Sequence, residues 1–364
     1  MKILKNAFLV SSFILIFGAI AEELHFPHRD STFVEILSSQ YIASIKADST
    51  KKIDFYTKNH DLVNSINLNF NVNHAFALSE DYFLVASLKR APDPKAINKA
   101  ILMKGDKIVE RFSNVRNIHL IPGGQHFAIE VATKKENIQT YLKLFNIKGG
   151  LVKDGIISEP SRFRMVAISS DLNTVALSPF STDSNSVLSI AVYSGESFSL
   201  ENVYEFDNTR IYQTIPLANG LVAINVDRRI AAMSGTRAEW TIPNKKVSFS
   251  VDALKQASDP NYMIAEENTG RILIIGLDGE IAFDSNAQEG QTFAEIMQNG
   301  AYTDVVNEQL VINDSNRGEA LIIPLNKPGQ TKHIRESNEI LSIDTTDGYI
   351  AFMKNEKLKI KKIK

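Results

Sequence analysis

A short unit recurs eight times along this chain of 364 residues: an apolar stretch, a polar turn, and a second, more hydrophobic stretch. Within each stretch, apolar and polar residues tend to alternate, which is the pattern of a β-strand. The copies span residues 33–45, 74–87, 118–131, 165–178, 212–225, 247–266, 302–313 and 340–352. Successive turns lie about 44 residues apart on average, which is a repeat length typical of stacked all-β units.

Two further strand-like runs lie between successive copies, for example residues 272–277 and 281–283. Each period therefore predicts four short antiparallel strands, which is the content of one β-propeller blade. A single blade cannot cover both of its faces, whereas blades stacked around an axis bury both. We therefore expect an all-β propeller, formed as one domain by residues 22–364.

The number of blades follows from the number of copies. We expect eight four-stranded blades, with seven blades and one irregular extra hairpin as the alternative. The last copy offers only three strand-like runs, at residues 340–345, 349–353 and 357–363. Residues 23–27 are expected to supply its fourth strand, so that the N- and C-terminal strands pair and close the ring.

The turn Ser169-Ser170-Asp171-Leu172-Asn173-Thr174-Val175-Ala176-Leu177 resembles the Ser-x-Asp-Gly-x-x-hydrophobic-Ala turn of YVTN-type and TolB-type propeller repeats. The segments at residues 78–86 and 345–351 are similar, although the copies are degenerate. This resemblance implies the propeller architecture and points to no specific family. The Asp and Ser side chains of these turns are expected to bond their own backbone, as such residues do in tight turns.

The N-terminus has the three-part layout of an export signal. Lys2 and Lys5 precede an uncharged apolar run from Ala7 to Ala21, which ends in Ala19-Ile20-Ala21 before two glutamates. Small residues at these positions predict cleavage after Ala21, and the run is short for a permanent membrane anchor. We expect a signal peptide over residues 1–21, a periplasmic or secreted protein, and no stable membrane span after cleavage.

The composition excludes several classes of site. The chain has 40 Lys and Arg against 42 Asp and Glu, so it lacks the basic excess typical of a nucleic-acid binder. It has no cysteine, which excludes disulfides, thiolate metal sites and thiol nucleophiles. Its seven histidines show none of the usual metal-ligand spacings, and no Gly-x-Ser-x-Gly motif occurs. We expect no cofactor, no metal site and no assignable catalytic residue.

Cations recur just before the strands expected to lie nearest the axis. If they converge, they make one mouth of the central channel positive and suited to an anionic ligand. The alternative is chance, because cations are common enough to fall in several of these windows. The candidate ligand-binding residues are Arg29, His74, Arg116, Arg164, Arg210, Lys246 and Arg335.

Two main functions remain open. The first is an exported binding scaffold that mediates protein–protein interaction in the cell envelope or outside the cell, since rigid scaffolds with variable loops suit recognition. The alternative is a propeller enzyme of the lactonase, quinoprotein dehydrogenase or glutaminyl cyclase type, with candidate groups His74, His119, Glu336 and Glu339 at the channel mouth. Adhesion to carbohydrate is a third reading, which the lone Trp240 supports weakly. The residues favour the scaffold, because nothing in them demands catalysis.

Overall fold

The computed structural model describes residues 33–37, 41–45, 50–57, 61–78, 81–88, 98–132, 140–157, 163–179, 188–194, 198–206, 211–226, 228–234, 237–243, 249–267, 269–287, 301–314, 317–336, 340–344, 348–354 and 357–363. These residues form antiparallel sheets and two short 3₁₀ turns, η2 (Ser285–Ala287) and η4 (Pro328–Gln330). The predicted signal peptide and residues 23–27 lie outside the described residues, so neither expectation is tested.

The first four sheets have four strands each, numbered from the axis outwards. They are β1 (Phe33–Ile36), β2 (Tyr41–Ile45), β3 (Lys52–Thr57) and β4 (Leu62–Asn67); β5 (His74–Ala77), β6 (Tyr82–Ser87), β7 (Lys99–Lys104) and β8 (Lys107–Ser113); β9 (Val115–Leu120), β10 (His126–Ala132), β11 (Thr140–Asn146) and β12 (Leu151–Ile157); and β13 (Phe163–Ile168), β14 (Thr174–Pro179), β15 (Leu188–Ser194) and β16 (Ser199–Phe206).

The next three sheets repeat this order, and the last one has three strands. They are β17 (Ile211–Pro216), β18 (Val222–Val226), β19 (Arg229–Ser234) and β20 (Arg237–Ile242); β21 (Ala253–Gln256), β22 (Tyr262–Glu266), β23 (Ile272–Gly276) and β24 (Ile281–Asp284); β25 (Tyr302–Val306), β26 (Gln309–Asp314), β27 (Glu319–Pro324) and β28 (Lys332–Arg335); and β29 (Ile340–Asp344), β30 (Tyr349–Lys354) and β31 (Lys357–Lys362).

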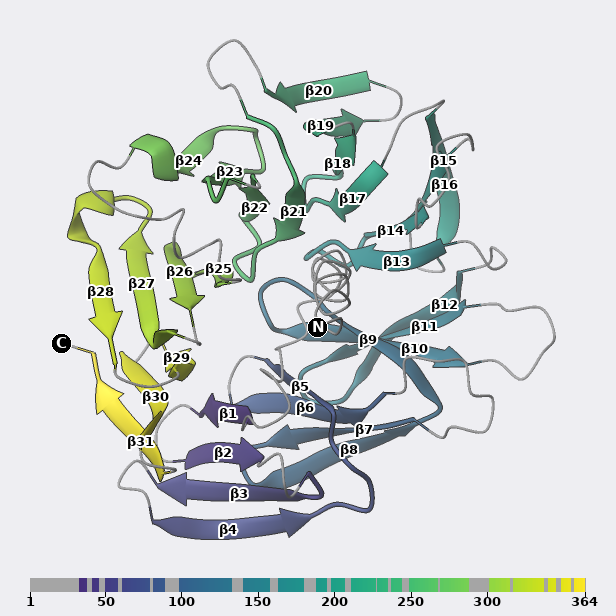
Figure 1. Ribbon diagram of the computed structural model, residues 1–364. Coiled ribbons are helices and arrows are strands. Elements are labelled where there is room, and N and C mark those ends of the chain that lie inside the picture. Colours follow the sequence, from purple (N-terminus) through teal and green to yellow (C-terminus); the bar gives the residue numbers. More distant parts are fainter. Residues whose placement is uncertain are drawn as a thin grey trace, which may run out of the picture.

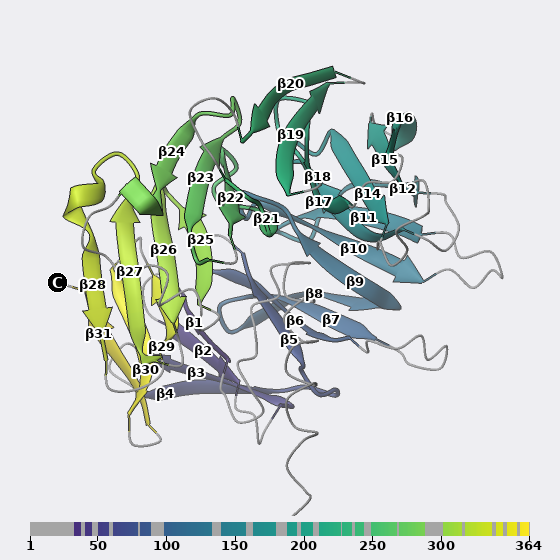
Figure 2. The same cartoon turned by 45° about the horizontal axis from the view of Figure 1, so that its top comes forward.

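The sheets stand side by side around a common axis, which makes the fold a β-propeller (Figure 1). The first strand of each sheet is innermost, and neighbouring inner strands contact one another, as β9 does β13 and β17 does β21. The outer strands, such as β4 and β28, lie on the rim, as the tilted view also shows (Figure 2). The all-β propeller predicted from the repeats is confirmed, as is the resemblance to propeller repeats at the level of architecture.

The blade count needs a correction. Seven sheets have four strands, as the alternative of seven four-stranded blades requires, and eight four-stranded blades are not supported because the last sheet has three strands among the described residues. The first and last sheets meet where β1 packs against β29 and β30. The expected pairing of residues 23–27 with the last sheet lies outside the described residues and stays a prediction.

The hydrophobic core is divided among the joints between neighbouring sheets. The strand β6 illustrates this, because its residues alternate between two clusters. Phe83 and Val85 pack into the cluster shared with the first sheet. Tyr82, Leu84 and Ala86 pack into the cluster shared with the third sheet. A strand buried on both faces reads as a continuous apolar run, which is why these segments stand out in the sequence.

A second kind of contact joins the sheets at the rim. Trp240 on β20 lies over the turn between β23 and β24, and its Nε1–H donates to the carbonyl of Leu277 at 3.2 Å. Gly279 in that turn has φ of +84°, and a Cβ there would lie 2.7 Å from Cδ2 of Trp240. Glycine is required twice at this position, once by the backbone conformation and once by the indole ring.

We expect Gly279→Ala to destabilise the protein more than Gly220→Ala. Both glycines have positive φ, at +84° and +82°, but a Cβ at Gly220 meets nothing within 4 Å. The shared backbone strain costs about 1 kcal/mol, and the clash with Trp240 adds about 1–3 kcal/mol. Urea unfolding followed by circular dichroism measures both variants. If both variants shift the unfolding midpoint equally, the indole ring of Trp240 moves aside without a loss of unfolding free energy.

Candidate functional site

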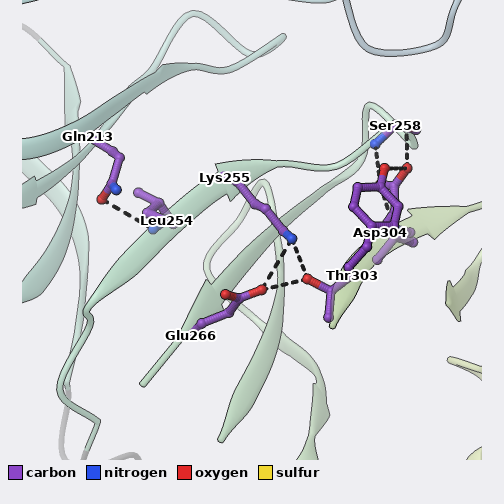
Figure 3. A network of polar contacts seen from close by, with 9 residues as sticks. Gln213, Leu254, Lys255, Ser258, Glu266, Thr303 and Asp304 are labelled. Atoms are coloured by element: carbon purple, nitrogen blue, oxygen red, sulfur yellow. Dashed lines mark hydrogen bonds and ion pairs between the residues drawn. The ribbon is translucent and has the colours of Figure 1, made fainter. Parts of the chain in front are cut away.

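A polar network joins the inner strands of the sixth and seventh sheets (Figure 3). Asp304 on β25 is 5% exposed, and both of its carboxylate oxygens are bonded. Oδ1 accepts the backbone N–H of Ser258 at 2.9 Å, and Oδ2 accepts the Ser258 hydroxyl at 2.5 Å. Oδ1 also accepts the N–H of Val305 at 2.7 Å, and Oδ2 accepts the Tyr302 hydroxyl at 3.1 Å. Burial raises the pKa of Asp304, against the opposing effect of the bonds from Ser258.

Two partly exposed charged residues and one buried hydroxyl form a triad beside this carboxylate, in the same view (Figure 3). Lys255 on β21 places Nζ 3.2 Å from Oε1 of Glu266 on β22 and donates to the hydroxyl of Thr303 on β25. That hydroxyl donates in turn to Oε1 of Glu266 at 2.5 Å. A lysine, a carboxylate and a hydroxyl are therefore mutually bonded across the joint between two sheets. The arrangement fixes this joint, because breaking one member leaves a partly buried charge without its partner.

The network also reaches across the axis. The carbonyl of Ser258 accepts the backbone N–H of Gly123 at 2.7 Å. Gly123 lies in the turn between β9 and β10 of the third sheet, which is not a neighbour of the sixth sheet in the ring (Figure 1). The turns of two separated sheets therefore meet at one end of the axis. Through Ser258, the carboxylate of Asp304 on the seventh sheet indirectly holds this contact.

A buried histidine–carboxylate hydrogen bond lies in the third sheet. His119 on β9 and Glu130 on β10 are both less than 10% exposed, and Nε2 lies 2.6 Å from Oε1. Nε of Arg116, which is half exposed on β9, lies 4.0 Å from Oε2 of Glu130. Burial acts to raise the pKa of Glu130, but the hydrogen bond from His119 and the charges of His119 and Arg116 lower it below its ordinary value.

The cations predicted to line the channel mouth have different positions. Arg116 is the second residue of the inner strand β9. His74 begins β5, where Nδ1 lies 2.7 Å from Oδ1 of Asn73. Arg335 ends the outer strand β28 and is 3.1 Å from Glu319, which places it on the rim rather than at the axis. Arg29, Arg210 and Lys246 lie outside the described residues, as does the side chain of Arg164, so a positive mouth stays a prediction.

The groups suggested for an enzyme are not brought together by any contact of the described residues. His119 is bonded to Glu130, whereas Glu336 accepts the Nζ of Lys361 at 2.7 Å at the joint of the last two sheets. Glu339 lies outside the described part of the chain. Among the described residues, no group of three or more His, Asp and Glu side chains is placed to hold a metal ion. No helix in the described ranges has the length and apolar character needed to cross a membrane.

Sequence reasoning missed the whole network around Asp304. The signal was present, because the inner strand Tyr302–Val306 carries Thr303 and Asp304 in the middle of a buried run. A carboxylate in such a run needs partners from a neighbouring element. The partner turn at Ser258 could not be assigned, since it belongs to a different sheet. The turn residue Asp171 behaves as expected, because its Oδ1 accepts the N–H of Asn173 at 3.0 Å.

Comparison with protein-family models finds no match, and comparison with curated protein sequences finds none either. Among solved structures, Sqt1 of Saccharomyces cerevisiae is similar with a TM-score of 0.51 and 13% identity, over 91% of this chain and 95% of that chain. BamB from Moraxella catarrhalis has a TM-score of 0.46 and 9% identity, over 91% of this chain and 98% of that chain. Apo AztD from Citrobacter koseri has a TM-score of 0.43 and 12% identity, over 85% of this chain and 87% of that chain. The similarity to Sqt1 supports the propeller fold and extends no further than the fold.

We expect Glu130→Gln to remove a pH-dependent part of the stability. Because the pKa of Glu130 is lowered on folding, its stabilisation is complete above the ordinary value of 4.5 and is lost as the pH falls through the lowered pKa. At neutral pH the variant should lose about 2 kcal/mol of unfolding free energy, since a buried charged hydrogen bond is broken. Towards about pH 3 its deficit should shrink.

The free energy of unfolding of the wild type and of Glu130→Gln is measured by chemical unfolding across this pH range. Glu239→Gln is the matched control, because that carboxylate is exposed on the outer strand β20, 3.9 Å from Arg237. A deficit for Glu130→Gln that stays constant with pH would contradict the role of the ionised Glu130 carboxylate.

Proposed function

We propose that this protein is an exported binding scaffold: a propeller that presents a rigid surface to a protein partner in the cell envelope or outside the cell. The proposal rests on one observation: polar side chains near the axis bond to one another at the joint between the sixth and seventh sheets. Asp304 accepts four hydrogen bonds, two of them from Ser258 across the joint, and Lys255, Glu266 and Thr303 are bonded to one another.

Those contacts give the ring the properties of a platform. The bond between Gly123 and Ser258 ties two separated sheets together across the axis, in addition to the joints around the ring. A platform held in this way binds with little loss of conformational freedom, which favours affinity. Recognition on such a scaffold falls to the surface of the sheets and their loops.

An anionic ligand at the channel mouth is a separate part of the proposal. Arg116 supports it, because the residue lies near the start of the inner strand β9 and its side chain is half exposed. The excess positive charge that an anion needs would come from the cations predicted alongside it.

Export predicts a defined mature N-terminus. The full chain should be recovered from the envelope or the medium as residues 22–364, beginning at Glu22, because Ala19 and Ala21 provide the small residues that the cleaving enzyme requires. Intact mass measurement identifies the first residue. Ala21→Arg should leave the precursor uncleaved, whereas the control Glu23→Gln should be processed normally. Recovery of the uncleaved wild-type chain in the cytoplasm would overturn export.

The binding function is tested by capture and then by titration. The full chain, tagged at its C-terminus, is expressed in its native cell, and proteins cross-linked to it in the envelope are identified by mass spectrometry. We expect one partner that, once purified, binds the purified protein at equal stoichiometry in isothermal titration calorimetry. An exported protein with the same tag is the control. Capture of nothing beyond that control by the folded protein would contradict the scaffold function.

A further inference from the structure

The charges of the outermost strands are distributed unevenly around the ring. In the first six sheets these strands are β4, β8, β12, β16, β20 and β24, and together they carry four cations and six carboxylates. In the last two sheets the outermost described strands are β28 and β31, whose residues include six cations and neither Asp nor Glu. We call these six residues the basic rim: Lys332, Arg335, Lys357, Lys359, Lys361 and Lys362.

The basic rim is one surface, because β28 and β31 lie side by side in both views (Figures 1 and 2). Lys361 pairs with Ile350, so it extends the apolar face that the last sheet turns toward the seventh. Lys359, two residues earlier on the same strand, lies on the same face. Lys332 pairs with Ile322, on the face that the seventh sheet turns toward the last. Lysines from both sheets therefore line the outer opening of this joint.

The basic rim keeps a positive excess after its bonded carboxylates are counted. Nζ of Lys361 lies 2.7 Å from Oε1 of Glu336, and the lysine side chain is 56% exposed. Nε of Arg335 lies 3.1 Å from Oε1 of Glu319, and the arginine side chain is 70% exposed. These two carboxylates keep their negative charge, but they oppose six cations. Three further lysines of the basic rim are exposed: Lys332, Lys359 and Lys362.

Protection of the sheet edges does not account for this segregation of charge. Charged residues on an outer strand discourage pairing with another chain, and either sign serves this purpose. Thus β16 carries Glu201 and Glu205, whereas β20 carries Arg237 and Glu239. Cations confined to two neighbouring sheets give one side of the ring a positive potential, which attracts a negatively charged surface.

The layout of the basic rim suits an extended anionic surface. Its six-residue strand β31 spans about 17 Å, and lysines are point charges on flexible stems that need no fixed geometry from their partner. A protein interface would need apolar anchors among these charges. Among the side chains whose exposure the structure describes, the exposed large apolar residues lie instead on β4, β8 and β12.

We propose that the basic rim binds the surface of a bilayer that contains anionic phospholipid. The cations of β28 and β31 lie in the negative potential of the lipid headgroups, where each cation adds to the attraction. Because these strands are on the rim, the bound ring stands with its axis along the plane of the membrane. Both ends of the axis then stay accessible to a partner. This inference goes beyond the proposed scaffold function and does not depend on it.

The decisive variant combines Lys332→Gln, Lys359→Gln and Lys362→Gln. It removes three exposed charges and keeps Lys361 and Arg335, which are bonded to Glu336 and Glu319. The matched control removes three exposed lysines from the second and third sheets by the substitutions Lys104→Gln, Lys107→Gln and Lys148→Gln. Both variants therefore have the same net charge. Urea unfolding verifies that both keep the wild-type midpoint.

Binding of the full chain is measured by co-sedimentation with two kinds of vesicle. One kind contains phosphatidylglycerol and phosphatidylcholine in equal amounts, and the other contains phosphatidylcholine alone. The N-terminal residues are the same in every variant, so differences between variants report on the substituted lysines. The wild type should prefer the anionic vesicles. Raising the salt concentration from about 0.1 M to about 1 M should remove this preference, because the Debye length falls from about 10 Å to about 3 Å.

The variant of the basic rim should bind the anionic vesicles about a hundredfold more weakly than the wild type, since each lysine near an anionic surface contributes about fivefold in affinity. The control variant should bind as the wild type does. Equal binding of the wild type to both kinds of vesicle would overturn the inference, as would equal weakening in the two variants. A third arm adds soluble polyglutamate. If the basic rim binds polyglutamate but not the anionic vesicles, its ligand is an acidic protein and the inference is wrong.

Discussion

Burial of apolar surface on both faces of each sheet is the constraint on which the structure depends. The residues of β6 are divided between two clusters, one shared with the first sheet and one with the third. Leu273 and Ile275 of β23 are divided in the same way from Ile272 and Ile274. A sheet with two apolar faces is stable only between two others, so the sheets must follow one another around an axis until the last meets the first. The contact of β1 with β29 is where this requirement is met.

Apolar burial sets the order of the sheets but fixes their separation only loosely, since it has no direction. Directional contacts supply the rest. Asp304 orients the turn at Ser258 through two bonds, and Ser258 holds Gly123 across the axis. At the rim, Trp240 rests on Gly279 and Asn64 binds Asp106. Directional contacts thus hold some joints near the axis and others near the rim.

Much of this fold could be predicted from the sequence, because the signals of strands and turns are local. Each recurring unit matches the first two strands of one sheet to within a few residues, as residues 74–87 contain β5 and β6. On β4 and β8 the pairing shifts by one residue, which leaves Val63 and Val109 as bulges. These bulges could not be predicted, since they depend on the register between strands, which alternation alone does not specify. The contact between Gly123 and Ser258 joins turns far apart in the sequence. Arg335 was assigned to the channel mouth because it lies shortly before Ile340, which begins the inner strand β29. It ends the outer strand β28 instead.

The position of Trp240 decides what its fluorescence can report. It is the single tryptophan of the chain, and it packs on the turn at Gly279 in the joint between the fifth and sixth sheets. Its emission therefore follows the opening of one joint, while circular dichroism follows the strands of the whole ring. If the joints open together, the two signals change in the same range of denaturant. If this joint opens first, the emission changes at a lower denaturant concentration than the circular dichroism. The joints of the ring then differ in stability.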